Sequence, residues 1–266
     1  MGEHDDWGAE WNIEEQTIEQ LVGYHEAREP IQGEGDQGGD RWGVLNILLC
    51  ILTMTMNIIQ TNYDKKCKQP SDINQHLPTL MKYAKECESV LELGVRGCVS
   101  SWAFAHGLVN NGKEKKVLFC NDLNPCNINE LQNSCKGIID VQYKWCSDLS
   151  LDFPDESFDI VFIDTLHVYG QLKRELNKFG KIATKYIIMH DTTVDKIHGE
   201  VRRYMMNQVD KLVKSTSIPK EELLVGLQPA IDEFVLDNPH WKVKEVFENN
   251  NGLTILEKIW YSNQFH

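Results

Sequence analysis

The alternation of apolar and polar positions divides the chain into three segments. Residues 1–41 are polar and acidic, with a short helical pattern over 12–25 and a glycine-rich linker over 32–40. Residues 42–60 carry no charged side chain and are rich in Leu, Ile and Met. From residue 61 to 266 short apolar runs alternate with amphipathic ones, a pattern typical of an α/β domain. We therefore expect a flexible acidic head, one apolar helix and a single larger domain.

Within the third segment, five short runs of apolar and β-branched residues predict strands, at 89–93, 117–121, 141–146, 158–163 and 185–189. Helical spacing leads into the first strand from residue 69 and recurs at 99–108, 127–136, 169–182, 198–213 and 228–236. Alternating runs at 241–247 and 253–257 flank an Asn-Gly turn and predict a hairpin. Together these patterns predict a doubly wound, mostly parallel sheet of seven strands, with helices on both faces and a C-terminal antiparallel hairpin.

The apolar segment 42–60 has two interpretations. Its length falls just inside the range of a membrane-spanning helix, roughly 17 to 25 residues, and basic residues follow it at Lys65, Lys66 and Lys68. By the positive-inside rule an anchored chain would keep the larger domain in the cytosol. Four polar residues interrupt the segment, however: Asn46, Thr53, Thr55 and Asn57. We favour a helix packed against the domain or a partner, in a cytoplasmic protein, over a membrane anchor.

The charge is unevenly distributed. Of the formal net charge of −13, the head accounts for −10, so the rest of the chain is close to neutral. No stretch has the density of Lys and Arg that a nucleic-acid surface requires, which disfavours a nucleic-acid partner. The eight cysteines are scattered and form no C-x-x-C pair, as expected in a reducing compartment.

The first predicted strand and the turn after it supply the first candidate ligand site. The strand carries the acidic Glu92 and is followed by Gly94 and Gly97, directly before a helical run. Glycines in such a turn let a ligand lie against the backbone, and the amide groups of the following helix add donors. The spacing departs from the G-x-G-x-x-G of dinucleotide folds, so it favours a different adenosine-bearing ligand.

Several motifs give this pattern a family resemblance. Val90-Leu-Glu-Leu-Gly94, the acidic Asp122 after the second strand, Phe158-Asp-Ile-Val-Phe-Ile-Asp164 and the closing hairpin resemble a class I S-adenosylmethionine-dependent methyltransferase. Other stretches resemble the branch with cephalosporin-hydroxylase-like proteins and macrolide sugar O-methyltransferases: Ser71-Asp-Ile-Asn-Gln-His-Leu77, Asp164-x-x-His167, His190-Asp-Thr192 and Asn249-Asn-Asn-Gly-Leu-Thr254. The resemblance covers about 69–258. It implies S-adenosylmethionine as cofactor and a hydroxylated small molecule, a sugar among the candidates, as acceptor.

The resemblance also implies roles at the ends of the early strands. Gly94 and Gly97 would admit the methionine part of the cofactor, and Glu92 would orient its ammonium group. Asp122 would accept the ribose hydroxyls, and Asp148 would meet the adenine amino group. Each carboxylate also has a structural alternative. Glu92 would be a buried carboxylate that hydrogen-bonds neighbouring backbone amides, Asp122 a turn residue, and Asp148 part of a polar loop. Arg96 would contact the cofactor carboxylate or form a surface salt bridge.

The reacting centre is expected at the ends of the fourth and fifth strands. These neighbouring strands would bring Asp164, His167, His190 and Asp191 together. Converging carboxylates repel unless a cation lies between them, so Asp164, His190 and Asp191 are candidate ligands for Mg²⁺ or another divalent metal. By resemblance His167 is the base. The branch has Glu-Asp where this chain has His190-Asp191, which suits a softer ion; alternatively His190 is the base and no metal binds.

Three functions are compatible with the sequence. The leading one is O-methylation of a hydroxylated acceptor. A hydroxylase-like or N-directed enzyme of the same fold is the second, and a catalytically silent cofactor-binding module is the third. Tyr169, Lys173 and Arg174 either line the acceptor pocket or form a solvated helix face. The sequence leaves open whether the chain forms a homo-oligomer.

Overall fold

The computed structural model describes residues 39–259, so the helical pattern over 12–25 and most of the acidic head lie outside the described residues. Its contacts divide the chain into two units, Met1–Ile47 and Leu48–His266. The second unit contains the whole sheet.

The sheet has seven strands in the order β3-β2-β1-β4-β5-β7-β6, which confirms the predicted fold class. The strands are β1 (Ser89–Leu93), β2 (Val117–Asp122), β3 (Asp140–Trp145), β4 (Phe158–Ile163), β5 (Ala183–His190), β6 (Trp241–Phe247) and β7 (Leu253–Lys258). Strands β1 to β5 pair in parallel, whereas β7 pairs antiparallel with both β5 and β6. The strand order reverses between β1 and β4, where ligands of open α/β sheets bind beyond the strand ends.

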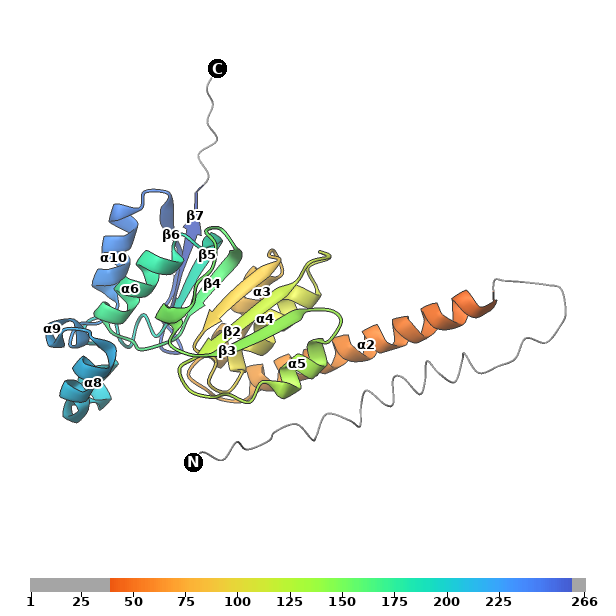
Figure 1. Ribbon diagram of the computed structural model, residues 1–266, viewed down its shortest axis with the longest axis horizontal. Coiled ribbons are helices and arrows are strands. Elements are labelled where there is room, and N and C mark those ends of the chain that lie inside the picture. Colours follow the sequence, from red (N-terminus) through yellow and green to blue (C-terminus); the bar gives the residue numbers. More distant parts are fainter. Residues whose placement is uncertain (1–38, 260–266) are drawn as a thin grey trace, which may run out of the picture. The chain divides into compact units, whose positions relative to one another are not determined.

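The helices after α2 are α3 (Leu77–Ala84), α4 (Val99–Val109), α5 (Asn129–Cys135), α6 (Tyr169–Phe179), α7 (Gly199–Tyr204), α8 (Val209–Thr216), α9 (Lys220–Leu223) and α10 (Gln228–Asp237). Helices α3 and α4 lie on one face and α6 and α10 on the other (Figure 1). Successive side chains of one strand serve opposite faces: Val90 packs toward α3 and α4, and Leu91 toward α6 and α10. Because both faces of the sheet are covered by helices, the strands are continuous apolar runs in the sequence.

The apolar segment 42–60 is part of a longer helix, α2 (Gly39–Lys68), which continues through residue 60 without a break. Near its end Ile59 and Tyr63 are buried in the core, and the Tyr63 ring stacks on His106 at a centroid distance of 4.7 Å. The end of α2 is therefore packed on the domain. Among residues 39–259, no helix combines the length and the apolar character needed to cross a bilayer.

The helix predicted over 198–213 is interrupted, which corrects the sequence expectation. Helix α7 ends at Tyr204, Met205 leaves helical geometry with φ −127° and ψ 19°, and a short 3-10 turn, Met206–Gln208, precedes α8. The reason is packing: Val201 and Val209 are buried in a small core of their own, with Val168, Ile218 and Leu223. On one straight helix these valines would lie on the same side but about 12 Å apart along its axis, whereas the break lets two short helices contribute them to one small core.

Candidate active site

The site lies at the carboxyl ends of β1, β4 and β5, beside the point where the strand order reverses. There the chain after β1 passes very close to the chain after β4, and the Asp164 amide donates to the Leu93 carbonyl at 2.8 Å. Gly94 has φ +93°, and a Cβ at this position would lie 1.9 Å from the Asp164 carbonyl oxygen. Gly94 is therefore required by the protein's own backbone. A Cβ on Gly97, in contrast, would meet no atom within 4 Å.

Asp122 ends β2 and fastens the turn that follows β1. Its Oδ2 accepts hydrogen bonds from the amides of Val95 and Arg96, at 3.0 and 2.9 Å, and its Oδ1 accepts one from the Asn124 amide at 2.8 Å. The Arg96 guanidinium forms a salt bridge with the Asp72 carboxylate, at 2.8 Å to each oxygen. Of the two roles expected for Arg96, the structure contains the salt bridge.

Glu92 lies beneath this turn and is fully buried. Ser100 donates to its Oε1 at 2.5 Å, and the Cys120 thiol donates to its Oε2 at 3.4 Å. Burial raises the pKa of Glu92 to about 7, although these hydrogen bonds act in the opposite direction. Both carboxyl oxygens are thus engaged by protein partners, as in the structural alternative stated for Glu92, although these partners are side chains and not backbone amides.

Asp148 belongs to a different group of side chains. It is buried after β3, where the Gln171 side-chain amide donates to both of its oxygens at 3.3 and 3.2 Å. Gln171 also donates to Glu175, and burial together with the neighbouring Asp148 raises the pKa of Glu175. The sequence contains no local signal for this contact, because Asp148 and Glu175 come from separate elements.

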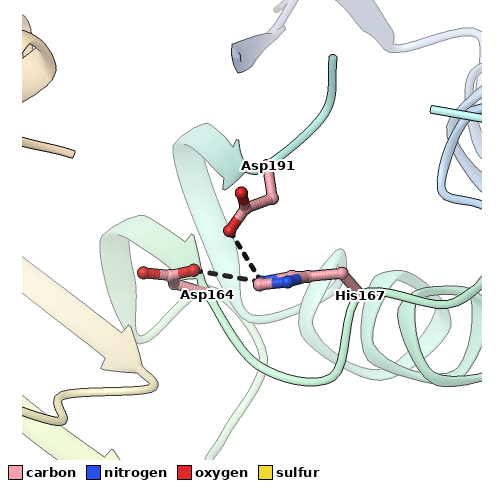
Figure 2. A group of neighbouring side chains, drawn as sticks. All are labelled: Asp164, His167 and Asp191. Carbon is pink, nitrogen blue, oxygen red and sulfur yellow. Dashed lines mark hydrogen bonds and ion pairs between the residues drawn. The ribbon is translucent and has the colours of Figure 1, made fainter. Parts of the chain in front are cut away.

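The predicted reacting centre is assembled as one group, which we call the His–Asp cluster: Asp164, His167, His190 and Asp191. His167 Nε2 lies 3.1 Å from Asp164 Oδ1 and 3.2 Å from Asp191 Oδ2, as Figure 2 shows. His190 Nδ1 lies 3.3 and 3.1 Å from the same two oxygens. Asp191 adopts the left-handed conformation, with φ +57°, directly after β5. Such backbone strain is common at functional sites.

Among residues 39–259, the second nitrogen of each imidazole lies beside hydrogen-bond acceptors. His190 Nε2 lies 3.1 Å from the Asp72 carbonyl and 3.2 Å from the Asn250 carbonyl. His167 Nδ1 lies 3.6 Å from Asp195 Oδ2 and 3.9 Å from Glu200 Oε2. The sequence analysis assigned none of these four neighbours a role, although Asp72 and Asn250 lie in two of the stretches that carry the branch resemblance. Asp195 had a weak signal, since it follows Asp191 by four residues in the same loop; the others are brought in by tertiary structure.

The electrostatics of the His–Asp cluster follow from its opposite charges. Burial lowers the pKa of both imidazoles, but hydrogen bonds and attraction from Asp164 and Asp191 outweigh it, raising the pKa of His167 to about 9 and that of His190 to about 10. Burial acts against the charged carboxylates, but the same partners hold the pKa of Asp164 and of Asp191 below the usual range. The four side chains therefore stabilise one another's charged forms.

The chemistry of the donors fits a divalent cation. Ligand atoms of Asp164, His167 and Asp191 all lie within 4.8 Å of one another. The sequence analysis had placed His190 and not His167 in this set; His190 Nδ1 faces the same two oxygens, but His190 is not a member of this group. Carboxylate oxygens and neutral imidazole nitrogens are established ligands of divalent ions.

The three residues at the start of α6 are engaged with other helices. Tyr169 and Lys173 both contact Glu233 of α10, at 2.9 Å in each case, and Arg174 pairs with Glu222 of α9 at 2.7 Å. These contacts tie α6 to its neighbours.

The comparisons with known proteins show a shared fold. No protein-family profile matches the sequence, and a search of curated proteins found no match. A solved protein of Corynebacterium glutamicum is 14% identical, with a TM-score of 0.50 over 93% of this chain and 99% of that one. A putative caffeoyl-CoA O-methyltransferase of Staphylococcus aureus is 14% identical, with a TM-score of 0.48 over 91% of this chain and 99% of that one.

A third solved structure is the SAH-bound methyltransferase PaMTH1 of Podospora anserina, which is 14% identical. Its TM-score is 0.45, and the match covers 98% of this chain and all of the other. At 14% identity the first likeness shows a shared fold and nothing about the reaction. The arrangement of this chain is a seven-stranded α/β sheet with a charged cluster at its strand-order reversal.

Proposed function

We propose that this chain transfers a methyl group from S-adenosylmethionine to a hydroxyl oxygen of a small molecule, with sugars among the candidate acceptors. The observation that carries the proposal is the juxtaposition of two half-sites at the strand-order reversal. A glycine turn and an acidic strand end lie on the β1–β2 side, and the His–Asp cluster lies on the β4–β5 side. Backbone contact between Leu93 and Asp164 joins the two halves.

The β1–β2 half is suited to the donor. Asp122 is held by three amides, yet a carboxylate has about four lone-pair sites, which leaves room for a hydrogen bond from the cofactor ribose. The turn leads into the N-terminus of α4, where free amides favour a carboxylate such as that of the methionine moiety. The open space beside Gly97 leaves this turn accessible.

The β4–β5 half is suited to the acceptor. In the transfer the hydroxyl oxygen forms a bond to the methyl carbon, the carbon–sulfur bond breaks with its electron pair staying on sulfur, and the hydroxyl proton must leave. The His–Asp cluster offers two routes for that proton. One imidazole, His167 or His190, accepts it directly; or a divalent cation held by the cluster lowers the pKa of the acceptor hydroxyl.

Two measurements test the proposal. Calorimetric titration with S-adenosylmethionine is expected to show one site per chain, and a panel of hydroxylated acceptors with methyl-labelled cofactor is expected to yield labelled product. Asp164→Asn should abolish transfer and retain cofactor binding. Absence of cofactor binding to the folded protein would refute the proposal.

A catalytically silent binding module is the second candidate. One observation favours it: both oxygens of Glu92 and the Nη2 of Arg96 are already bonded to protein partners. This candidate predicts cofactor binding with no labelled product from any acceptor, with and without added divalent metal.

A further inference from the structure

We infer that Glu175 is a protonated carboxylic acid that donates its proton to Asp148, and that it is a positioning residue for the Asp148 carboxylate. The inference rests on the proposed function for what Asp148 then does, which is to accept a hydrogen bond from the adenine amino group of the cofactor. The proton on Glu175 is measured without cofactor, so the two proposals fail separately.

One face of α6 covers the short 3-10 turn Asp148–Ser150, which follows β3. Gln171, Glu175 and Lys178 lie on this face, because they are four and three residues apart. Gln171 Nε2 lies 3.3 and 3.2 Å from the two Asp148 oxygens and 2.8 Å from Glu175 Oε1. Lys178 Nζ donates to a backbone carbonyl of the same turn at 2.7 Å. These contacts hold the turn against α6 and bring the carboxyl groups of Asp148 and Glu175 together.

The two oxygens of Glu175 have different surroundings. Oε1 accepts hydrogen bonds from the Thr165 hydroxyl and from Gln171. Oε2 is buried and has no hydrogen-bond partner among residues 39–259. An ionised carboxylate can only accept, so an ionised Glu175 would leave Oε2 unpaired inside the protein. A proton on Oε2 makes this oxygen a donor, which then requires an acceptor close by.

Asp148 is that acceptor. Burial and the neighbouring Asp148 carboxylate, both as a charge and as a hydrogen-bonding partner, raise the pKa of Glu175 well above its usual value. The donors Gln171 and Thr165 are neutral and cannot offset two negative charges, whereas one proton between the carboxyl groups removes their repulsion. Asp148 keeps the charge because it is 8% exposed, against 1% for Glu175.

The shared proton orients Asp148 and leaves it able to bind a ligand. A carboxylate has about four lone-pair sites, and Gln171 and Glu175 together do not fill them. The remaining site suits an amino group, such as that of adenine, and disfavours a carbonyl oxygen, such as that of hypoxanthine. Glu175 therefore contributes to the choice of an adenosine ligand through Asp148, without touching the ligand itself.

The first measurement is infrared difference spectroscopy of the full chain near neutral pH, wild type minus Glu175→Gln. We expect the carbonyl stretch of a protonated carboxylic acid in the wild type, and its absence from the variant. The subtraction removes the contribution of other buried acids, Glu92 among them. Glu233→Gln, which changes a half-exposed residue of α10, is the matched control and should keep the band. Absence of the band from the wild type, or its persistence in Glu175→Gln, would overturn the inference.

The second measurement tests the positioning role by calorimetric titration with S-adenosylhomocysteine and with S-inosylhomocysteine. Wild type and Glu175→Gln should both prefer the adenosine ligand by about 10-fold or more, because the Gln amide also donates to Asp148. Glu175→Ala removes this donor, and the preference should fall about fivefold or more. If Glu175→Ala does not fold, the Gln variant and the infrared band decide.

An unchanged preference in Glu175→Ala, or a lost preference in Glu175→Gln, would overturn the positioning role. The infrared band in a chain that binds neither ligand would refute only the proposed function. Binding of S-adenosylhomocysteine by a wild-type chain without the band would refute only the inference about Glu175.

Discussion

The two halves of the site use their charged side chains differently. On the β1–β2 side, Asp122 holds backbone amides, Arg96 pairs with Asp72, and Glu92 is engaged below the turn. On the β4–β5 side, two carboxylates and two imidazoles face one another across 3.1 to 3.3 Å. In the first half the charged side chains hold the turn after β1 and its neighbours in place. In the second half four charged side chains converge at one point. We therefore expect substitutions in the first half to affect mainly stability, and substitutions in the second to affect mainly chemistry.

The largest expected effect is on methyl transfer. His167→Gln removes an imidazole that either accepts the hydroxyl proton or holds the cation, so the rate of labelled product formation should fall about 1000-fold or more. Affinity for S-adenosylmethionine should stay within about twofold, because the donor half does not contact this side chain. His240→Gln, before β6, is the control and should retain full activity. If His167→Gln lost cofactor affinity together with methyl transfer, the separation into a donor half and an acceptor half would be wrong.

Gly94→Ala should produce the largest loss of stability. The new methyl group would overlap the Asp164 carbonyl, and φ +93° is strained for any residue with a Cβ, so the free energy of unfolding should fall by about 3 kcal/mol or more. Gly97→Ala is matched in sequence and chemistry but points into open space, and should change stability by less than about 0.5 kcal/mol. Urea unfolding measures both. Equal losses in the two variants would contradict the assigned backbone contact.

Glu92→Gln should remove a pH dependence of stability. The unfolded chain releases this proton near pH 4.5 and the folded chain keeps it to about pH 7, so folding binds the proton and stability falls as pH rises through that window. The loss amounts to about 3 kcal/mol. Urea unfolding at pH 5 and pH 7 should show this extra decline in the wild type but not in the variant. If the unfolding free energy of wild type and of Glu92→Gln changed with pH in the same way, Glu92 would be charged in the folded state.

The smallest effect is expected for Arg96→Ala. The Arg96 side chain is 74% exposed, and exposed salt bridges contribute less than about 1 kcal/mol. Its Nη2 is paired with the Asp72 carboxylate, so we expect S-adenosylmethionine affinity to change less than about threefold. Asp72→Ala is the paired control by calorimetry. A much larger loss for Arg96→Ala alone would assign this residue to the cofactor carboxylate.

The pairing of β4 with β5 and the edge that carries the site could be predicted locally. Apolar runs identified β4 and β5, and the residues at their ends, Asp164 and His190, were expected to be neighbours because consecutive parallel strands tend to pair. Their observed pairing confirms this. The helix over 198–213 was predicted wrongly, because its break depends on a small core that brings Val168 and Ile218 to Val201 and Val209.

The sequence by itself determined which residues stand at strand ends, since a strand's length and the turn after it are set by a few neighbouring side chains. It also determined that Asp164, His167, His190 and Asp191 share one edge of the sheet. Only the tertiary structure decided what each of them faces. His190 is oriented by carbonyls of Asp72 and Asn250, 118 and 60 residues away, and His167 by Asp195 and Glu200. Such partners depend on how distant loops pack together, and no local pattern encodes that packing.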